Sequence, residues 1–214
     1  TDADLLRTAH SLEYTALAVY EAAAGTGALS ADESAIAARI VDDHTRHAAA
    51  IGALVTAAGA EEFACANPFL IDRLVNPVLA ALEANGGTDD LHRDVLNIAW
   101  GVEQLAGSSY QSLVVALTEP ALRKAAMQIG GEELRHATVL ARAINPDQTF
   151  SPTFSGGTEA KNDDGFLLPY GIPSVFGKVS GFELIVGARN EEGARFSTQL
   201  QTPAANTIIY AYES

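Results

Sequence analysis

The chain has 214 residues, 27 acidic and 13 basic, with a formal net charge of −14, and its 48% hydrophobic share is enough for one globular domain with an appendage. The acidity and the lack of a Lys/Arg cluster argue against nucleic acid and anionic lipid as partners. The single cysteine, Cys65, excludes a disulfide framework and multi-cysteine metal sites, and no apolar stretch is long enough to span a membrane.

Composition changes near residue 146. The first part is rich in Ala and Leu with helical periodicity, whereas Pro, Gly, Ser, Thr and aromatic residues dominate the rest, which carries 8 acidic and 4 basic residues. We therefore expect a helical domain over residues 1–146 and a C-terminal tail over residues 147–214.

Four long helices and one short helix are predicted in the first part, from the apolar spacing and from the capping and breaking residues between them. Gly25 and Gly27 end the first helix, and the segment Ser30-Ala31-Asp32-Glu33 is a capping box that begins the second. Pro77 lies inside the short helix. The expected ranges are Asp2–Ala24, Ala31–Ala58, Phe69–Glu83, Asp89–Leu117 and Pro120–Ile144.

The order of these helices describes two hairpins joined by a long crossover. A tight turn at Thr118-Glu119-Pro120 closes the second hairpin. This is the connectivity of a four-helix bundle with one crossover. The predicted fold class is therefore mainly α: a four-helix bundle of two αα-hairpins, whose long crossover holds the short helix, plus a C-terminal extended or β tail.

Carboxylates and histidines recur on the predicted helices at spacings that suit a metal ion. Glu133 and His136 are three residues apart, as are His44 and His47, so each pair lies on one helix face about one turn apart. Each of the other two long helices carries one glutamate in an apolar segment, Glu13 and Glu103.

The distances of these residues from the hairpin turns indicate their heights along the bundle. In an antiparallel helix pair, two residues are level when they are equidistant from the turn. The midpoints of Glu13 with His44 and His47 fall at 28.5 and 30, inside the first turn. Those of Glu103 with Glu133 and His136 fall at 118 and 119.5, inside the second turn. The candidate ligands of each hairpin are therefore predicted to be level.

The two hairpins also repeat one another. A separation of 89 or 90 residues relates Glu13 to Glu103, His44 to Glu133, His47 to His136, and Tyr20 to Tyr110. Carboxylates turned into a core without a cation are strongly destabilising, and a bound metal is the simplest compensation.

On these residues the chain resembles the ferritin-like superfamily of carboxylate-bridged dimetal four-helix bundles, whose pattern is one Glu from each of two helices and Glu-x-x-His from each of the other two. Segments such as Leu12-Glu13-Tyr14 resemble exported bacterial members, and the tail segments Asn190-Glu191-Glu192-Gly193 and Gln201-Thr202-Pro203 resemble actinobacterial ones. The resemblance covers residues 1–146 and implies dioxygen or peroxide chemistry at two Fe or Mn ions. The residues that match the pattern position by position are Glu13, His47, Glu103, Glu133 and His136.

One position departs from the family pattern. His44 stands where the family has the Glu that usually bridges the metals, so one negative charge and one bridge are missing. Imidazole suits Zn, Cu and Ni as well as Fe. Three outcomes stay open: a dimetal site bridged by Glu133 and solvent, a single-metal site, or a degenerate site. Asp43 is expected to support the site from behind the ligands, and it would replace the missing Glu only if the helix rotated or bulged locally.

Several neighbouring residues have two interpretations. His10, three residues before Glu13, either supports the site from behind or lies at the surface or at a cap. Tyr20 and Tyr110 either fill the core or hydrogen-bond near the metals, with a redox role as a further alternative. Glu132 is expected to be a solvent-exposed neighbour of the candidate ligands.

The tail is predicted to form strands rather than helices. Phe182–Ala188 and Ala194–Gln201 are expected to pair through a turn at Asn190-Glu191-Glu192-Gly193, and Thr207–Tyr212 is a third expected strand. Two or three strands alone are marginal in water, so they must pack on the bundle or on another subunit. We expect an interaction element that joins subunits into a homo-oligomer, with a cover over one end of the bundle as the alternative.

The function expected from these features is that of a metal-dependent oxidoreductase that acts on dioxygen, peroxide or Fe(II). Its cofactor would be Fe or Mn, as two ions or one, and Zn also fits the ligands. Export is expected from the resemblance and from a start at Thr1 without Met. The competing prediction is a non-enzymatic structural or assembly protein of the cell envelope, built on a ferritin-like scaffold with a vestigial metal site.

Overall fold

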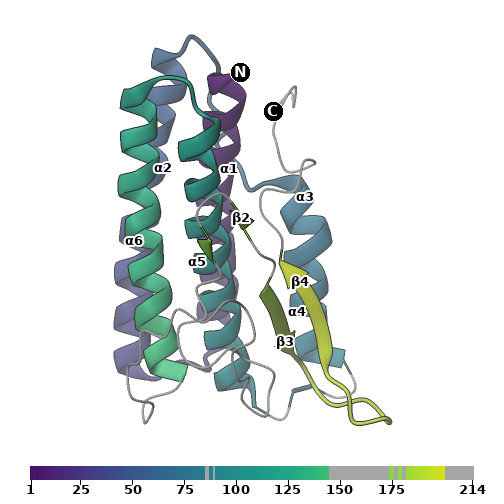
Figure 1. Ribbon diagram of the computed structural model, residues 1–214. Coiled ribbons are helices and arrows are strands. Elements are labelled where there is room, and N and C mark those ends of the chain that lie inside the picture. Colours follow the sequence, from purple (N-terminus) through teal and green to yellow (C-terminus); the bar gives the residue numbers. More distant parts are fainter. Residues whose placement is uncertain (85–86, 89, 145–173, 176–177, 180–181, 201–214) are drawn as a thin grey trace.

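The computed structural model describes residues 1–84, 87–88, 90–144, 174–175, 178–179 and 182–200, and the protein is mainly helical. Four long helices stand side by side in a bundle, and a short helical stretch and a β-hairpin lie beside it (Figure 1). The long helices are α1 (Asp2–Gly25), α2 (Ala31–Ala57), α5 (Leu91–Ala116) and α6 (Pro120–Ile144). The predicted bundle is therefore confirmed, with helix ends within about two residues of those expected.

The helix starts are set by local capping. Ser30 Oγ accepts a hydrogen bond from the Glu33 amide at 3.3 Å, and Glu33 Oε2 accepts one from the Ser30 amide at 2.8 Å, so the predicted capping box begins α2. The start of α5 lies two residues later than expected because Asp90 is its N-cap and accepts from the Arg93 amide at 3.0 Å.

The crossover between α2 and α5 carries the expected short helix in three pieces. They are α3 (Pro68–Leu70), the π-helical η1 (Ile71–Val75) and α4 (Asn76–Glu83). The π-helical turn ends two residues before Pro77, which has no amide hydrogen to continue a regular ladder. The buried Asn67 caps this stretch through the amides of Phe69 and Leu70, and its own side-chain amide donates to Ser11 Oγ at 3.0 Å. The crossover is thereby fixed to α1.

Two apolar clusters fill the bundle, one above and one below a polar layer. On α2, Ile40 belongs to one cluster and Ile51 to the other. On α6, Ala137 and Ile129 are divided in the same way. The histidines and carboxylates of the two helices lie between these positions, so their polar layer is sealed at both ends by close-packed side chains.

The described part of the tail packs on its own bundle. Strand β3 (Phe182–Val186) pairs antiparallel with β4 (Phe196–Leu200), which confirms the expected hairpin, and Leu184 and Val186 join the larger apolar cluster beside α4 and α5 (Figure 1). A second antiparallel pair is formed by β1 (Ser174–Val175) and β2 (Lys178–Val179). The third expected strand, 207–212, lies outside the described residues.

A buried ion pair fastens this hairpin to the start of α5. Asp94 is fully buried and lies 3.1 Å from Nη2 of Arg195. The same carboxylate accepts hydrogen bonds from the Gly187 amide at 2.8 Å and from the Thr88 hydroxyl at 2.6 Å. The hairpin thus covers a flank of the bundle, not its end, and a role in joining subunits stays a prediction.

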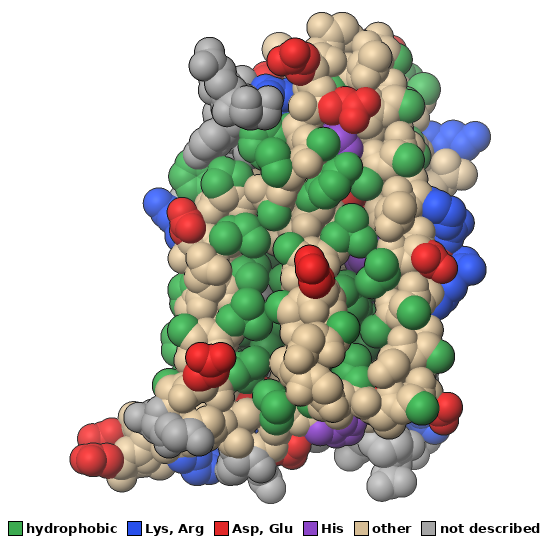
Figure 2. All heavy atoms as spheres, turned by 180° about the vertical axis from the view of Figure 1, so that it is seen from behind, with side chains coloured by type: hydrophobic (Ala, Val, Ile, Leu, Met, Phe, Trp, Pro, Cys, Tyr) green, Lys and Arg blue, Asp and Glu red, His purple; other side chains and the backbone are tan. Residues whose placement is uncertain are grey.

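Acidic side chains are spread over the solvent-exposed surface of the protein. Figure 2 shows the face opposite to that of Figure 1, on which most acidic side chains lie apart from one another among hydrophobic ones. In the part of the chain that the structure describes, no helix is both long and apolar enough to cross a membrane.

Candidate metal centre

All six residues proposed as ligands lie in the polar layer at one height of the bundle. Each is at most 8% exposed, and each of the four long helices contributes at least one of them. Their donor atoms form two overlapping groups, in each of which the atoms lie within 4.8 Å of one another. The first donor set is Glu13, His44, His47 and Glu133, and the second donor set is His44, Glu103, Glu133 and His136.

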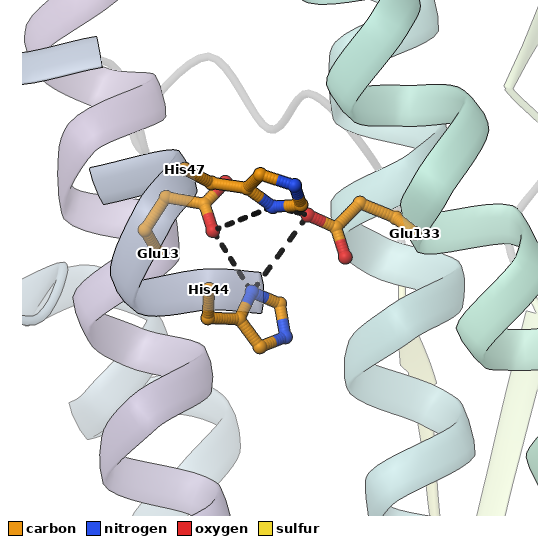
Figure 3. Close-up of side chains that lie close together, drawn as sticks. All are labelled: Glu13, His44, His47 and Glu133. Carbon is orange, nitrogen blue, oxygen red and sulfur yellow. Dashed lines mark hydrogen bonds and ion pairs between the residues drawn. The ribbon is translucent and has the colours of Figure 1, made fainter. Parts of the chain in front are cut away.

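The first donor set brings α1, α2 and α6 together (Figure 3). Nδ1 of His44 lies 2.8 Å from Oε2 of Glu13, and Nδ1 of His47 lies 2.8 Å from Oε1 of Glu133. The crossed distances are 3.6 Å from His47 Nδ1 to Glu13 and 3.7 Å from His44 Nδ1 to Glu133. These four side chains converge on one point between the helices.

The second donor set lies on the other side of the two shared residues. Nε2 of His44 lies 3.1 Å from Oε1 of Glu103. Nδ1 of His136 lies 3.2 Å from Oε2 of Glu103 and 3.1 Å from Oε2 of Glu133. His44 and Glu133 therefore belong to both sets, and the other four ligands belong to one set each.

The outward nitrogens of two histidines are held by further carboxylates. Nε2 of His47 lies 2.9 Å from Glu132 Oε2, and Nε2 of His136 lies 3.2 Å from Asp43 Oδ2. A carboxylate on the far ring nitrogen fixes the ring orientation of a metal-ligating histidine. Glu132 is accessible to solvent as expected, with 38% of its side chain exposed, but its carboxylate also reaches across to α2, which was not expected.

Asp43 does not take the place of the missing glutamate. Helix α2 runs as regular α-helix through this position, without the bulge that such a replacement requires, and Asp43 belongs to neither donor set. Its carboxylate instead holds His136 and pairs with the exposed Arg39 and Arg46. The centre therefore faces solvent between α2 and α6, behind a rim of ion pairs.

Two tyrosines form hydrogen bonds from inside the bundle to Glu13 and Glu103. These two glutamates belong to one donor set each and are called the terminal glutamates below. Tyr20 donates a hydrogen bond to Glu103 Oε1 at 2.6 Å, and Tyr110 donates one to Glu13 Oε1. Burial, together with the neighbouring glutamate charges, raises the pKa of both hydroxyls well above the ordinary value. Both tyrosines therefore act as neutral hydrogen-bond donors, and a redox role stays a prediction.

His10 lies in the interior and not at the surface or at a cap, so that interpretation is wrong. It is 1% exposed and packs edge-on against Tyr14 at a centroid distance of 5.2 Å. Its Nδ1 has no hydrogen-bond partner among the described residues, and burial lowers its pKa. It contributes to neither donor set.

Without metal, the histidines themselves supply positive charge to the centre. Burial lowers the pKa of His47 and His136, but hydrogen bonds to the buried glutamates outweigh this and raise the two values to about 10 and about 9. Burial also lowers the pKa of His44, but the negative charges around it, that of Glu103 first, outweigh burial. The pKa of His44 is therefore raised well above its ordinary value. Three imidazolium rings therefore face three buried glutamates.

The pKa values of the three buried glutamates are shifted in different directions. Burial raises the pKa of Glu13, but hydrogen bonds from two histidines outweigh it and bring the value below normal. The pKa of Glu103 is also lowered, by the charge of His44 and by hydrogen bonds, against burial. The pKa of Glu133 is raised by burial and by the charge of Glu13. Glu133 is thus the carboxylate whose negative charge is least compensated by the protein.

The donors suit a transition-metal ion. They are imidazole nitrogens and carboxylate oxygens, which are ligands for Fe, Mn and Zn, and the exposed Cys65 takes no part. Burial of six such groups, with ring orientations fixed from outside, is compatible with a metal site.

The residue that sequence reasoning missed is Glu132, although a signal for it exists. The separation of 89 residues that relates His44 to Glu133 also relates Asp43 to Glu132. In the structure these two carboxylates have equivalent roles, since each holds the histidine of the opposite helix. Extending the repeat by one position predicts this contact.

Comparison with known proteins gives one match. Residues 1–146 match the family model described as "Ferritin-like domain". No curated protein and no solved structure matches the chain.

Proposed function

The chain belongs to the ferritin-like domain family, and on this premise we propose that its buried centre binds two divalent transition-metal ions and that the protein is an oxidoreductase. The substrate class is dioxygen, peroxide or Fe(II). The proposal concerns residues 1–146, over which the family model matches. Export and homo-oligomer formation belong to the same proposal on sequence grounds alone.

The observation that carries the proposal is that the two carboxylate oxygens of Glu133 lie in different donor sets. Its Oε1 lies 2.8 Å from His47 Nδ1 in the first set, and its Oε2 lies 3.1 Å from His136 Nδ1 in the second. A carboxylate that presents one oxygen to each of two ligand groups has the arrangement of a bridge between two ions. Ions held there would supply the charge stabilisation and substrate orientation of a two-metal site.

The protein's own part in this chemistry is to neutralise, orient and exclude water. Three glutamates supply negative charge, the outer carboxylates hold the histidine rings, and the tyrosines hold the terminal glutamates. When bound, Fe or Mn would supply the one-electron redox chemistry that these side chains lack; Zn would fit the same donors but has no redox chemistry.

The exposure of the centre suits a small substrate. Only His47 and His136 among the ligands reach solvent, with 8% and 10% of their side chains, at the rim between α2 and α6. This small exposure favours a diatomic molecule, a peroxide or a metal ion over a larger substrate.

Elemental analysis after reconstitution tests the proposal. Protein stripped with a chelator and reloaded anaerobically with Fe(II) or Mn(II) should hold two ions per chain and should then consume dioxygen or peroxide. Glu133→Gln should hold fewer ions, whereas Glu119→Gln, an exposed change on the same helical hairpin, should bind as the wild type does. Trace metal alone in the wild type would contradict the proposal and favour a structural role for the bundle.

A further inference from the structure

His44 is held differently from the other two histidines of the centre. In His47 and His136, Nδ1 points inward to a buried glutamate and Nε2 contacts an outer carboxylate, that of Glu132 or Asp43. His44 is fully buried, and both of its ring nitrogens face inner glutamates: Nδ1 lies 2.8 Å from Glu13 and Nε2 lies 3.1 Å from Glu103. It therefore has two inward donor atoms where the others have one.

Those two nitrogens point into different donor sets. Glu13 belongs only to the first set and Glu103 only to the second, so the ring of His44 stands between the two sets with one nitrogen toward each. Glu133 does the same with its two oxygens. The 89-residue repeat places His44 and Glu133 at equivalent positions. The two shared residues thus have the same relation to the two sets.

From these four donor atoms we propose that His44 bridges the two metal ions through both ring nitrogens, as an imidazolate. This inference rests on the proposed dimetal function. Each N–H bond of the ring breaks as the ions bind, its proton passes to solvent, and each nitrogen lone pair becomes a metal ligand. The bridge that the family pattern assigns to a glutamate here would then be made by a histidine.

Charge balance supports the same assignment. Two divalent ions bring four positive charges, and Glu13, Glu103 and Glu133 bring three negative ones. A neutral His44 leaves one positive charge in a buried layer, whereas an imidazolate cancels it. Divalent ions favour deprotonation of the ligands that they bind. Imidazole nitrogen is also a good ligand for Cu(II), which provides a probe.

The test uses Cu(II) as the probe, with the full chain and three variants. Two Cu(II) ions joined by an imidazolate are antiferromagnetically coupled, so the EPR signal of the two-copper wild type should be much smaller than that of two isolated ions. His44→Gln should hold one ion or two uncoupled ions. His44→Glu should again hold two ions, since a carboxylate can bridge. His92→Gln removes an exposed histidine at the start of α5, about three turns before Glu103, and should behave as the wild type.

The outcomes separate this inference from the proposed function. No bound metal of any kind in the wild type would overturn both. Two ions with an additive EPR signal in the wild type, or a coupled pair that is unchanged in His44→Gln, would overturn the bridge and leave a dimetal centre. The wild-type measurement stands even if a variant fails to fold, which circular dichroism would detect.

Discussion

Tyr20 on α1 and Glu103 on α5 are joined by a buried hydrogen bond of 2.6 Å across the two hairpins. Tyr110 and Glu13 are joined in the reverse direction, so each hairpin holds the terminal glutamate of the other. These bonds fix the relative rotation of α1 and α5. They also make the stability of the bundle depend on the same side chains that define the centre.

Replacing Tyr20 should lower the stability of the metal-free protein. Tyr20→Phe removes the hydroxyl that donates to Glu103 and leaves a buried carboxylate with one fewer donor. We expect a loss of about 1–3 kcal/mol in the free energy of unfolding, measured in urea. Tyr14→Phe is the matched control on α1, because Tyr14 is partly exposed, and it should change the value by about 0.5 kcal/mol or less. Equal losses in both variants would contradict the role of the Tyr20 hydroxyl.

The outer carboxylate Glu132 should tune the metal affinity without touching a metal. Glu132→Ala removes the partner of His47 Nε2, so the ring loses its fixed orientation. We expect metal affinity to fall by about 10–100-fold in competition with a chelator. Asp42→Ala changes an exposed carboxylate beside the centre and serves as the control for general charge effects. If the two variants lost affinity to the same degree, orientation of the ring would not be the cause.

The metal-free protein should be less stable in alkali than near neutrality. The folded-state pKa values of His47 and His136 are raised to about 10 and about 9 from 6.5, so their contribution is fully present below pH 6.5 and is lost as the pH rises through those values. The pKa of Glu13 is lowered from 4.5, so its contribution is present above pH 4.5 and is lost as the pH falls through its folded value.

Thermal unfolding of chelator-treated protein measures this dependence. We expect a higher Tm at about pH 6 than at about pH 9 or about pH 3. His47→Gln should lower the Tm overall and reduce the alkaline loss, because one of the titrating groups is gone. A Tm that rises steadily from about pH 6 to about pH 9 would show that the histidines are not held as cations.

The docking of the tail hairpin depends on close contact at Gly187. A Cβ atom there would lie 2.4 Å from the carbonyl oxygen of Ala81 on α4, and the residue has a φ of +84°. Gly187→Ala should therefore loosen β3 and make the hairpin more sensitive to limited proteolysis. Gly193→Ala is a close control, because its φ is +82° but the space around it is open. A hairpin cut at the same rate in both variants would mean that backbone strain matters and the α4 contact does not.

The parts of the fold that follow from short stretches of sequence could be predicted. Ser30 and Glu33 cap α2 by bonds over three residues, and the hairpin turns fix which residues are level. For the same reason the six candidate ligands could be placed in one layer.

Contacts between the hairpins could not be predicted in this way, because they depend on how the helices rotate when they pack. Tyr20 and Glu103 are separated by 83 residues, and His47 and Glu132 by 85. The pair of Asp94 with Arg195 spans 101 residues and depends on where the hairpin docks. The burial of His10 has the same origin, since neighbours in the sequence do not reveal which helix covers it.

The equivalence of the two hairpins has a consequence for metal choice. Each donor set contains one glutamate and one histidine of its own, and both share His44 and Glu133, so the inner residues would offer two bound ions the same composition. A protein built in this way has no inner means of sorting two different metals into two places. Any preference between the places must come from outside, where one ring is held by Asp43, which pairs with Arg39 and Arg46, and the other by the more exposed Glu132, which pairs with Arg135. We therefore expect a centre that loads with a single kind of metal.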